Sequence, residues 1–227
     1  MSVPIVATPR QRRKEARPQE LLDAALELFV EKGFAATRQD EIAARAGVSK
    51  GTLYLYYPSK EELLKAVIRE RLSSEIEAGM QQARQHTGTN ADLLRTLLPR
   101  WWENMFNSPA SGVFKLIITE VRAFPEIADY YMREVIEPGH NLIGTVLQRG
   151  IDAGEFRPVN VEAAVHSLVL PMVMLCLHKH SLGACSAVES LGRPHDFIKQ
   201  HVDLVIRGLQ AEAPEPVPLT AKKSKRA

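Results

Sequence analysis

TRQDEIAARAGVSKGTLYLYY, residues 37–57, is the stretch that decides the fold, because it predicts two short helices joined by a tight turn. A capping pattern that begins at Thr37 opens the first helix. Gly47 ends it, since glycine adopts a left-handed C′ conformation at little cost. Ser49 caps a second helix over residues 50–56. A three-residue turn that contains a glycine matches the helix-turn-helix unit.

The second helix departs from what a purely structural helix needs. Leu53 can face a core, whereas the opposite arc carries Gly51 and Leu55 beside Tyr54. A glycine within a helix costs about 1 kcal/mol relative to alanine, and exposed Leu and Tyr side chains favour association. The missing side chain at Gly51 lets the backbone lie close to another molecule, and Lys50 supplies a donor for phosphates or base edges. We therefore expect this helix to contact a binding partner.

Residues 47–64, GVSKGTLYLYYPSKEELL, resemble the DNA-binding motif of tetracycline-repressor-type (TetR-family) regulators. The resemblance extends from about Leu21 to Leu64, and the turn, the second helix and the start of the next helix match in register. It implies an all-α fold of about nine helices, with an N-terminal three-helix domain followed by a helical effector-binding and dimerisation domain. It also implies a sequence-specific transcriptional regulator, a repressor that binds a near-palindromic operator as a dimer and is released by a small, largely apolar effector.

The resemblance places the helix over residues 50–56 in the major groove of double-stranded DNA. The residues then expected at base edges or near the groove floor are Lys50, Gly51, Thr52 and Leu55. The residues expected to hold phosphates are Tyr54, Tyr56 and Lys60. At the start of the preceding helix, backbone or base contacts are expected from Arg38 and Gln39. Packing between helices is the alternative role for Tyr56.

Composition restricts the class of protein. The chain has 227 residues, of which 45% are hydrophobic, enough for a core of one or two domains. Its net charge is only +2, but the basic excess lies in the first 71 residues and in the C-terminal tail, as DNA contact requires. The longest apolar run, residues 168–177, is short for a membrane span. Two cysteines, Cys176 and Cys185, form no disulfide framework. We expect a cytoplasmic protein without membrane association.

The chain divides into four segments by pattern. Residues 1–17 are basic and proline-containing, which predicts a flexible arm that either reaches DNA or only aids solubility. Residues 18–64 are the expected DNA-binding domain, with the motif at about 38–57. Residues 65–211 are the expected effector and dimerisation domain. Residues 212–227 are rich in proline and lysine, which predicts disorder. The helix that starts at Lys60 is expected to run on into the second domain.

Apolar side chains in the second domain form a candidate effector pocket. By themselves they are more typical of ordinary core, but the resemblance places an effector pocket within this set of helices. The pocket residues expected on this basis are Trp101, Trp102, Met105, Phe106, Phe114, Ile118 and Tyr130. Glu120, Arg122 and His140 are candidate polar anchors, and nothing in the sequence ranks them.

The segments over residues 161–180 and 194–209 are expected to pair with their symmetry mates in a four-helix bundle. The first is apolar on all sides at its centre, and such a helix must be covered on every side. The expected interface residues are Leu168, Met172, Leu175, Phe197, Val202, Val205 and Leu209. A monomer with a buried hairpin is the alternative.

Other classes of protein find less support. Cys176, His178 and His180 are two residues apart, which places neighbours on opposite sides of a helix and makes a poor metal site. No nucleophile elbow, zinc motif, phosphate loop or dinucleotide motif is present, so we expect neither an enzyme nor a cofactor. A helical adaptor without DNA specificity is the main alternative. Such an adaptor would show no sequence-preferring, salt-dependent binding to DNA.

Overall fold

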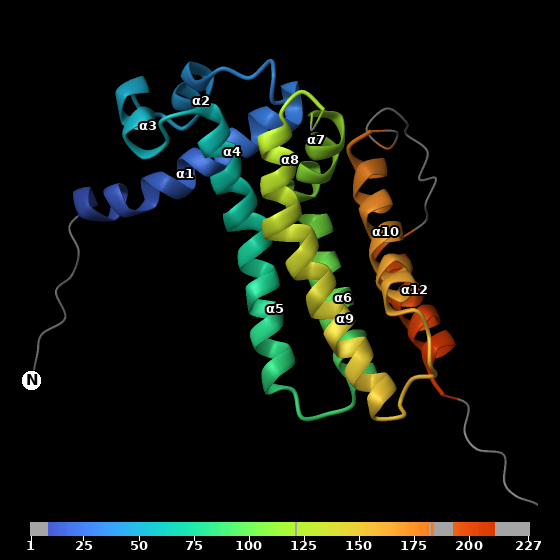
Figure 1. Ribbon diagram of the computed structural model, residues 1–227. Helices are drawn as coiled ribbons and strands as arrows, with labels where there is room; N and C mark the ends of the chain where they lie inside the picture. The colour runs from blue at the N-terminus through green and yellow to red at the C-terminus, as the bar shows by residue number, and fades with distance from the viewer. Residues whose placement is uncertain (1–8, 121, 182, 184–192, 212–227) are drawn as a thin grey trace, which may run out of the picture.

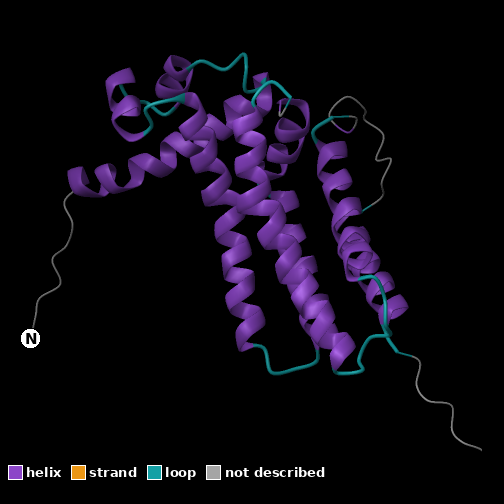
Figure 2. Ribbon diagram, viewed as in Figure 1, coloured by secondary structure: helices purple, strands orange, loops and turns teal. Residues whose placement is uncertain are grey.

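The computed structural model describes residues 9–120, 122–181, 183 and 193–211. All regular structure in these ranges is helical, as the sequence predicts, and no strand occurs among them (Figures 1 and 2). The short helices α2 and α3 lie with α1 at one end of the molecule, and long helices extend side by side toward the other end. The predicted tail, residues 212–227, falls outside the described residues.

The small N-terminal unit consists of α1 (Pro9–Lys32), α2 (Gln39–Arg45) and α3 (Lys50–Tyr56). Its core is closed by fully buried apolar side chains from each helix: Leu21, Ala25, Phe29, Phe34, Ile42 and Leu53. Gly47 has φ +66, and the amide of Val48 donates to the carbonyl oxygen of Ala43 at 2.9 Å, so the turn forms as expected. Ser49 Oγ accepts from the amide of Thr52 and caps α3.

Two details at the N-terminus differ from the sequence prediction. First, α1 begins at Pro9 rather than Pro18, so Pro18 lies within the helix and only residues 1–8 of the predicted arm precede it. Second, the cap of α2 is Arg38, whose amide donates to Glu41 Oε2 at 3.3 Å. Thr37 is buried instead, and its hydroxyl donates to the carbonyl oxygen of Gly33 at 2.7 Å. A hydroxyl can satisfy a buried carbonyl as well as a helix end, and the sequence alone does not distinguish the two roles.

A continuous helical path joins the N-terminal unit to the long helices, as the sequence predicts. It comprises α4 (Lys60–Ile68), the π-helical segment η1 (Arg69–Ser73) and α5 (Ser74–Gln85). Buried residues Leu64, Ile68, Leu72 and Ile76 follow at intervals of four along this path. In a regular α-helix such a run drifts off one face, because one turn holds 3.6 residues. The wider turn of η1 keeps these side chains facing the core.

The centre of the molecule is formed by α6 (Asn90–Asn107), the 3₁₀ turn η2 (Pro109–Ser111), α7 (Gly112–Glu120) and a second interrupted path. That path comprises α8 (Pro125–Tyr131), the π-helical segment η3 (Met132–Ile136) and α9 (Glu137–Asp152). Pro138 lies two residues after the end of η3. Because proline cannot donate a backbone hydrogen bond and crowds the preceding turn, an irregular turn is expected there. The irregularity is a π-helical segment, and η3 touches η1.

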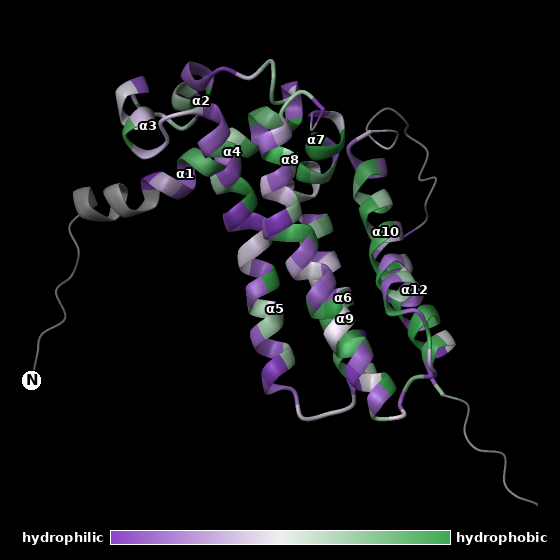
Figure 3. Cartoon of the chain, in the orientation of Figure 1, coloured by the Kyte–Doolittle hydropathy of each residue, from purple (hydrophilic) through white to green (hydrophobic). Residues whose placement is uncertain are grey.

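The last two helices, α10 (Val161–Lys179) and α12 (Pro194–Leu209), lie along one side of the molecule. The inner faces of these helices pack on α6, α7 and α9. Figure 3 shows that α10 is apolar along most of its length. It is long and apolar enough to cross a membrane by length and composition alone, a test that core helices of water-soluble proteins also pass.

Candidate DNA-binding surface and effector cavity

The outer face of α3 carries the side chains that the sequence assigns to DNA. Leu53 is fully buried and fixes the inner face, whereas Leu55 is 82% exposed and Tyr54 is 40% exposed. Lys50 and Gly51 are exposed on the same side, and the Lys50 ammonium lies 5.8 Å from the centre of the Tyr54 ring. A Cβ at Gly51 would meet only Ser49 Oγ, at 3.9 Å, so this part of the helix is open to an approaching molecule.

Two expected contact residues on α3 also have roles within the protein. The Thr52 hydroxyl lies 2.9 Å from Ser49 Oγ, so it belongs to the cap of the helix. Tyr56 is half-buried and packs against the core. Both side chains retain exposed surface beside Leu55, so the structure brings the α3 residues of the prediction together on one surface.

The start of α2 lies next to α3 and carries the other two expected residues. Arg38 is exposed, and its guanidinium donates to Asp40 Oδ2 at 3.0 Å. Backbone hydrogen bonds at its own position, followed by the bond from Arg38, lower the pKa of Asp40. Gln39 Nε2 is buried and has no acceptor among the described residues. DNA that occupied this surface would meet the guanidinium of Arg38 first.

Lys60 does not have the free ammonium that a phosphate contact needs. Its three N–H groups are matched by three backbone carbonyl oxygens, those of Phe34 at 2.7 Å, Thr37 at 3.0 Å and Ala35 at 3.1 Å. These acceptors belong to the loop between α1 and α2. The expected phosphate contact of Lys60 is therefore corrected: its ammonium holds the start of α4 against this loop. Backbone acceptors cannot be read from side-chain patterns, which is why the sequence did not predict this contact.

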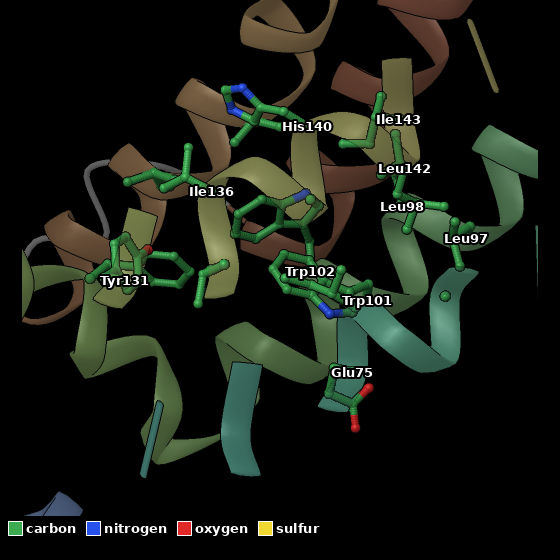
Figure 4. A pocket seen from close by; sticks show the side chains of 17 residues that line it. Glu75, Leu97, Leu98, Trp101, Trp102, Tyr131, Ile136, His140, Leu142 and Ile143 are labelled. Atoms are coloured by element: carbon green, nitrogen blue, oxygen red, sulfur yellow. The ribbon is translucent and has the colours of Figure 1, made fainter. Parts of the chain in front are cut away.

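A cavity of about 80 Å³ lies between the long helices, lined by residues from α5, α6, α7, α8, η3, α9 and α10. Of the seven expected pocket residues, Trp101, Trp102 and Phe114 line it (Figure 4). The other lining residues come mainly from neighbouring helices: Glu75, Ile76, Gly79, Leu97, Leu98, Tyr131, Val135, Ile136, Gly139, His140, Leu142, Ile143, Val169 and Val173.

The remaining four expected pocket residues lie elsewhere. Met105 is buried in the core, and Phe106 packs against the ammonium of Lys179. Ile118 is 56% exposed on the surface of α7. Tyr130 packs toward η1, where its hydroxyl oxygen accepts a hydrogen bond from Arg69 Nε at 3.2 Å. Helical periodicity identifies an apolar face but does not show which part of it borders a cavity.

His140 is the one candidate polar anchor that borders the cavity. Its ring meets that of His166 edge to face, with centroids 5.1 Å apart. Burial, and then the neighbouring His166, lower the pKa of His140, which favours the neutral form of its ring. It also borders a second, open hollow between α9 and α10. His140 therefore lies between this cavity and the open hollow.

The outer faces of α10 and α12 differ from the predicted interface. Five of the seven expected residues are buried within the protomer, namely Leu168, Met172, Leu175, Val202 and Leu209. The exposed apolar side chains are instead Leu170, Met174 and Leu204, with Phe197 of the prediction beside them. We call these four residues the outer apolar face. Because the centre of α10 is apolar on all sides, periodicity could not show which side faces inward.

The cavity and the DNA-facing unit are linked by the two interrupted helical paths. Ile76 lines the cavity three residues after η1, and Val135 and Ile136 of η3 line it directly. Tyr130, just before η3, bonds to Arg69 of η1. The cavity therefore borders η3 and the start of α5, and η1 connects α5 to α4.

A helix-turn-helix unit with an exposed helix, joined to a helical domain with a cavity, defines a DNA-binding regulator. Two family models match the chain: bacterial regulatory proteins of the tetR family over residues 21–67, and the tetracyclin repressor-like C-terminal domain over residues 84–187. Together they cover more than half of the sequence. The chain belongs to the TetR family of transcriptional regulators, and it is a sequence-specific DNA-binding protein.

Individual relatives agree with this assignment. The chain is 28% identical over 165 residues to the uncharacterized HTH-type transcriptional regulator YfiR of Bacillus subtilis, covering 70% of this chain and 77% of that protein. It is also 28% identical to the fatty acid metabolism regulator protein of the same organism, and the match covers 63% of this chain and 74% of that protein. The solved structure of the fatty acid degradation regulator FadR from Bacillus halodurans has the same fold, with a TM-score of 0.69 and 22% sequence identity. The match covers 85% of this chain and 99% of that chain.

Proposed function

We propose that this regulator binds a near-palindromic operator as a homodimer, with α3 of each protomer in the major groove, and that a small, largely apolar effector in the cavity releases it. The observation that carries the DNA assignment is the face of α3. Its Leu53 side is locked in the core, while Leu55, Tyr54 and Lys50 are presented outward. Helices that read the major groove combine donors for phosphates and bases with apolar groups for thymine methyls in this way.

The proposed homodimer forms through the outer apolar face. Leu170, Met174 and Leu204 are each more than half exposed in the single chain. A second copy of the chain would bury them and would place two α3 helices on one side of the assembly, related by a two-fold axis. Such a dimer reads two half-sites whose separation is set by the distance between the helices. A cytoplasmic location is part of this proposal, since the operator and the effector must both reach the protein.

Effector release would follow from a coupling free energy between cavity and operator, of about 1–3 kcal/mol. An effector that fits only one arrangement of η1 and η3 would favour that arrangement. The continuous path through α4 would then move the DNA-binding unit, because Lys60 at the start of α4 is hydrogen-bonded to the loop between α1 and α2. Operator affinity would fall if the new separation of the two α3 helices no longer matched the half-sites.

The test is selection of DNA from a random pool by the purified full chain, followed by titration at two salt concentrations. The expected result is an inverted repeat whose affinity falls steeply as salt rises, because Arg and Lys side chains displace counterions from phosphates. Lys50→Ala is the informative variant, and it should relax preference at one base pair of each half-site. An exposed lysine far from α3, Lys199, supplies the matched control as Lys199→Ala. Selection of no common sequence would contradict the proposal.

A further inference from the structure

Both tryptophans of the chain line the cavity, and neither indole N–H has a protein acceptor among the described residues. Trp102 is 3% exposed, and its Nε1 and that of Trp101 are shielded from solvent. A buried donor without an acceptor costs about 1–3 kcal/mol, so such donors normally have partners. The rings lie edge to face, 4.4 Å apart, in the middle of the lining residues (Figure 4). Two unpartnered donors therefore belong to neighbouring residues that line the cavity.

The remaining lining restricts the charge of that ligand. None of the residues that line the cavity is a lysine or an arginine. Burial lowers the pKa of His140 and so favours its neutral ring, and Glu75, the only carboxylate among the lining residues, is exposed. An anionic group among these residues would be desolvated without a counter-ion and would meet the like charge of Glu75. A neutral acceptor oxygen, by contrast, loses little solvation and finds the two indole donors.

We propose that the effector is a neutral, largely apolar molecule with a hydrogen-bond acceptor oxygen, such as a ketone or ester, which accepts from the indole N–H of Trp102 with Trp101 beside it. This inference rests on the proposed effector role of the cavity and adds the chemistry of the ligand. Apolar side chains from α5, α9 and α10, including Ile76, Ile143 and Val173, would enclose its hydrocarbon part. The effector differs from a plain hydrocarbon because it must carry an acceptor oxygen. It is not a carboxylate, because no lysine or arginine lines the cavity.

Four probes of matched shape test the proposal on the full chain. They are methyl pentyl ketone, the alkene in which a methylene group replaces its carbonyl oxygen, hexanoate, and the amine with the same carbon skeleton. Calorimetry gives the affinity, and tryptophan emission reports contact, because the only two tryptophans border the cavity. The ketone is expected to bind at least tenfold more tightly than hexanoate and to change the emission. Equal or tighter binding of the alkene, hexanoate or the amine, or no binding of the ketone, would overturn the proposal.

The donor itself is tested by Trp102→Phe, which keeps an aromatic ring and removes the N–H. Loss of one hydrogen bond should weaken ketone binding about 3- to 10-fold and leave alkene binding unchanged. Phe114→Leu is the matched control, since Phe114 lines the cavity without a polar atom and its change should affect both probes alike. An equal loss for ketone and alkene in Trp102→Phe contradicts the proposal. Should that variant not fold, the comparison of the four probes on the unmodified chain still decides.

Failure of this inference is distinguishable from failure of the proposed function. The function predicts that a bound effector lowers operator affinity, whereas the inference concerns only which chemistry binds. Ketone binding that depends on Trp102 without release of operator DNA supports the inference and contradicts effector release. Release of DNA by hexanoate, with no binding of the ketone, supports effector release and contradicts the inference.

Discussion

The ammonium of Lys60 lies 2.7 Å from the carbonyl oxygen of Phe34 and 4.6 Å from the centre of the Phe34 ring. The same ammonium donates to two further carbonyls of the loop, so α1, the loop and α4 are held at one point. Phe34 in turn is fully buried against Phe29 and Phe124. The contact joins the DNA-binding unit to the helix that leads to the cavity.

We expect Lys60→Met to destabilise the fold by about 2–4 kcal/mol, because it removes a charged donor from three carbonyls and leaves them unsatisfied. Chemical denaturation of the free protein measures the loss. Lys50→Met is the matched control: Lys50 is exposed and should change DNA affinity while leaving the free energy of unfolding within about 0.5 kcal/mol. A Lys60→Met protein of unchanged stability that loses one phosphate contact in its salt dependence would restore the phosphate role.

Leu55 offers a second prediction, because it is 82% exposed at the centre of the proposed DNA surface. An apolar side chain there is suited to a thymine methyl group. We expect Leu55→Ala to keep the thermal stability of the free protein. We also expect it to lower the discrimination between the correct and a wrong base pair at one operator position by about 1–3 kcal/mol.

The thymine contact can be isolated by replacing each thymine of the selected operator with uracil, which lacks only the methyl group. At the contacted position, uracil should weaken binding of the unmodified protein and have no effect on Leu55→Ala. Additive losses at every thymine would show that Leu55 contacts something else.

The outer apolar face predicts an effect on assembly. Leu204 is 70% exposed in the single chain, so Leu204→Glu should leave the protomer folded and separate the dimer by placing a carboxylate in its apolar interface. Sedimentation at micromolar concentration should show a species of half the mass. Leu55→Glu, at a comparably exposed leucine outside this face, should remain dimeric. Retention of the dimer by Leu204→Glu would place the interface elsewhere.

His140 predicts a dependence of stability on pH. Burial, followed by the neighbouring His166, lowers its pKa below the ordinary 6.5, while Glu162 acts weakly in the opposite sense. The unfolded chain therefore binds a proton at a higher pH than the folded chain. The stabilising contribution of neutral His140 is present above pH 6.5 and is lost as the pH falls from there through the folded-state pKa.

The measurement is the thermal midpoint at several values between pH 8 and pH 5, compared with His140→Gln, which cannot titrate. The midpoint of the unmodified protein should fall more steeply on acidification than that of the variant. Parallel curves would show that His140 has an ordinary pKa in the folded protein.

The sequence predicted the DNA-binding unit well because its features are local. Gly47 acts through its own backbone conformation and Ser49 through its side-chain cap on α3, and Leu53 and Leu55 occupy opposite sides of that short helix. The long path from Lys60 was also predictable, since its apolar residues recur without interruption. The interval of four from Leu64 to Ile76 was the available signal for the π-helical turn.

The cavity and the outer apolar face could not be predicted to the same degree because both depend on how separate helices meet. Ile76, Val135 and Val169 come together from three helices that are far apart in sequence. Met172 and Met174 are chemically alike and two residues apart, yet one is fully buried and the other is 62% exposed. Only the packing of α10 on α7 and α9 separates them.

The π-helical segments η1 and η3 have a consequence for comparison of this chain with its relatives. A π-helical turn holds one residue more than an α-helical turn, and one added residue rotates the rest of a helix by about 100°. A relative with a regular helix at Arg69–Ser73 would need a one-residue gap there in any alignment. Without the gap, cavity residues such as Ile76 would be matched to outward-facing positions, and effector preferences transferred between the two proteins would be assigned to the wrong side chains.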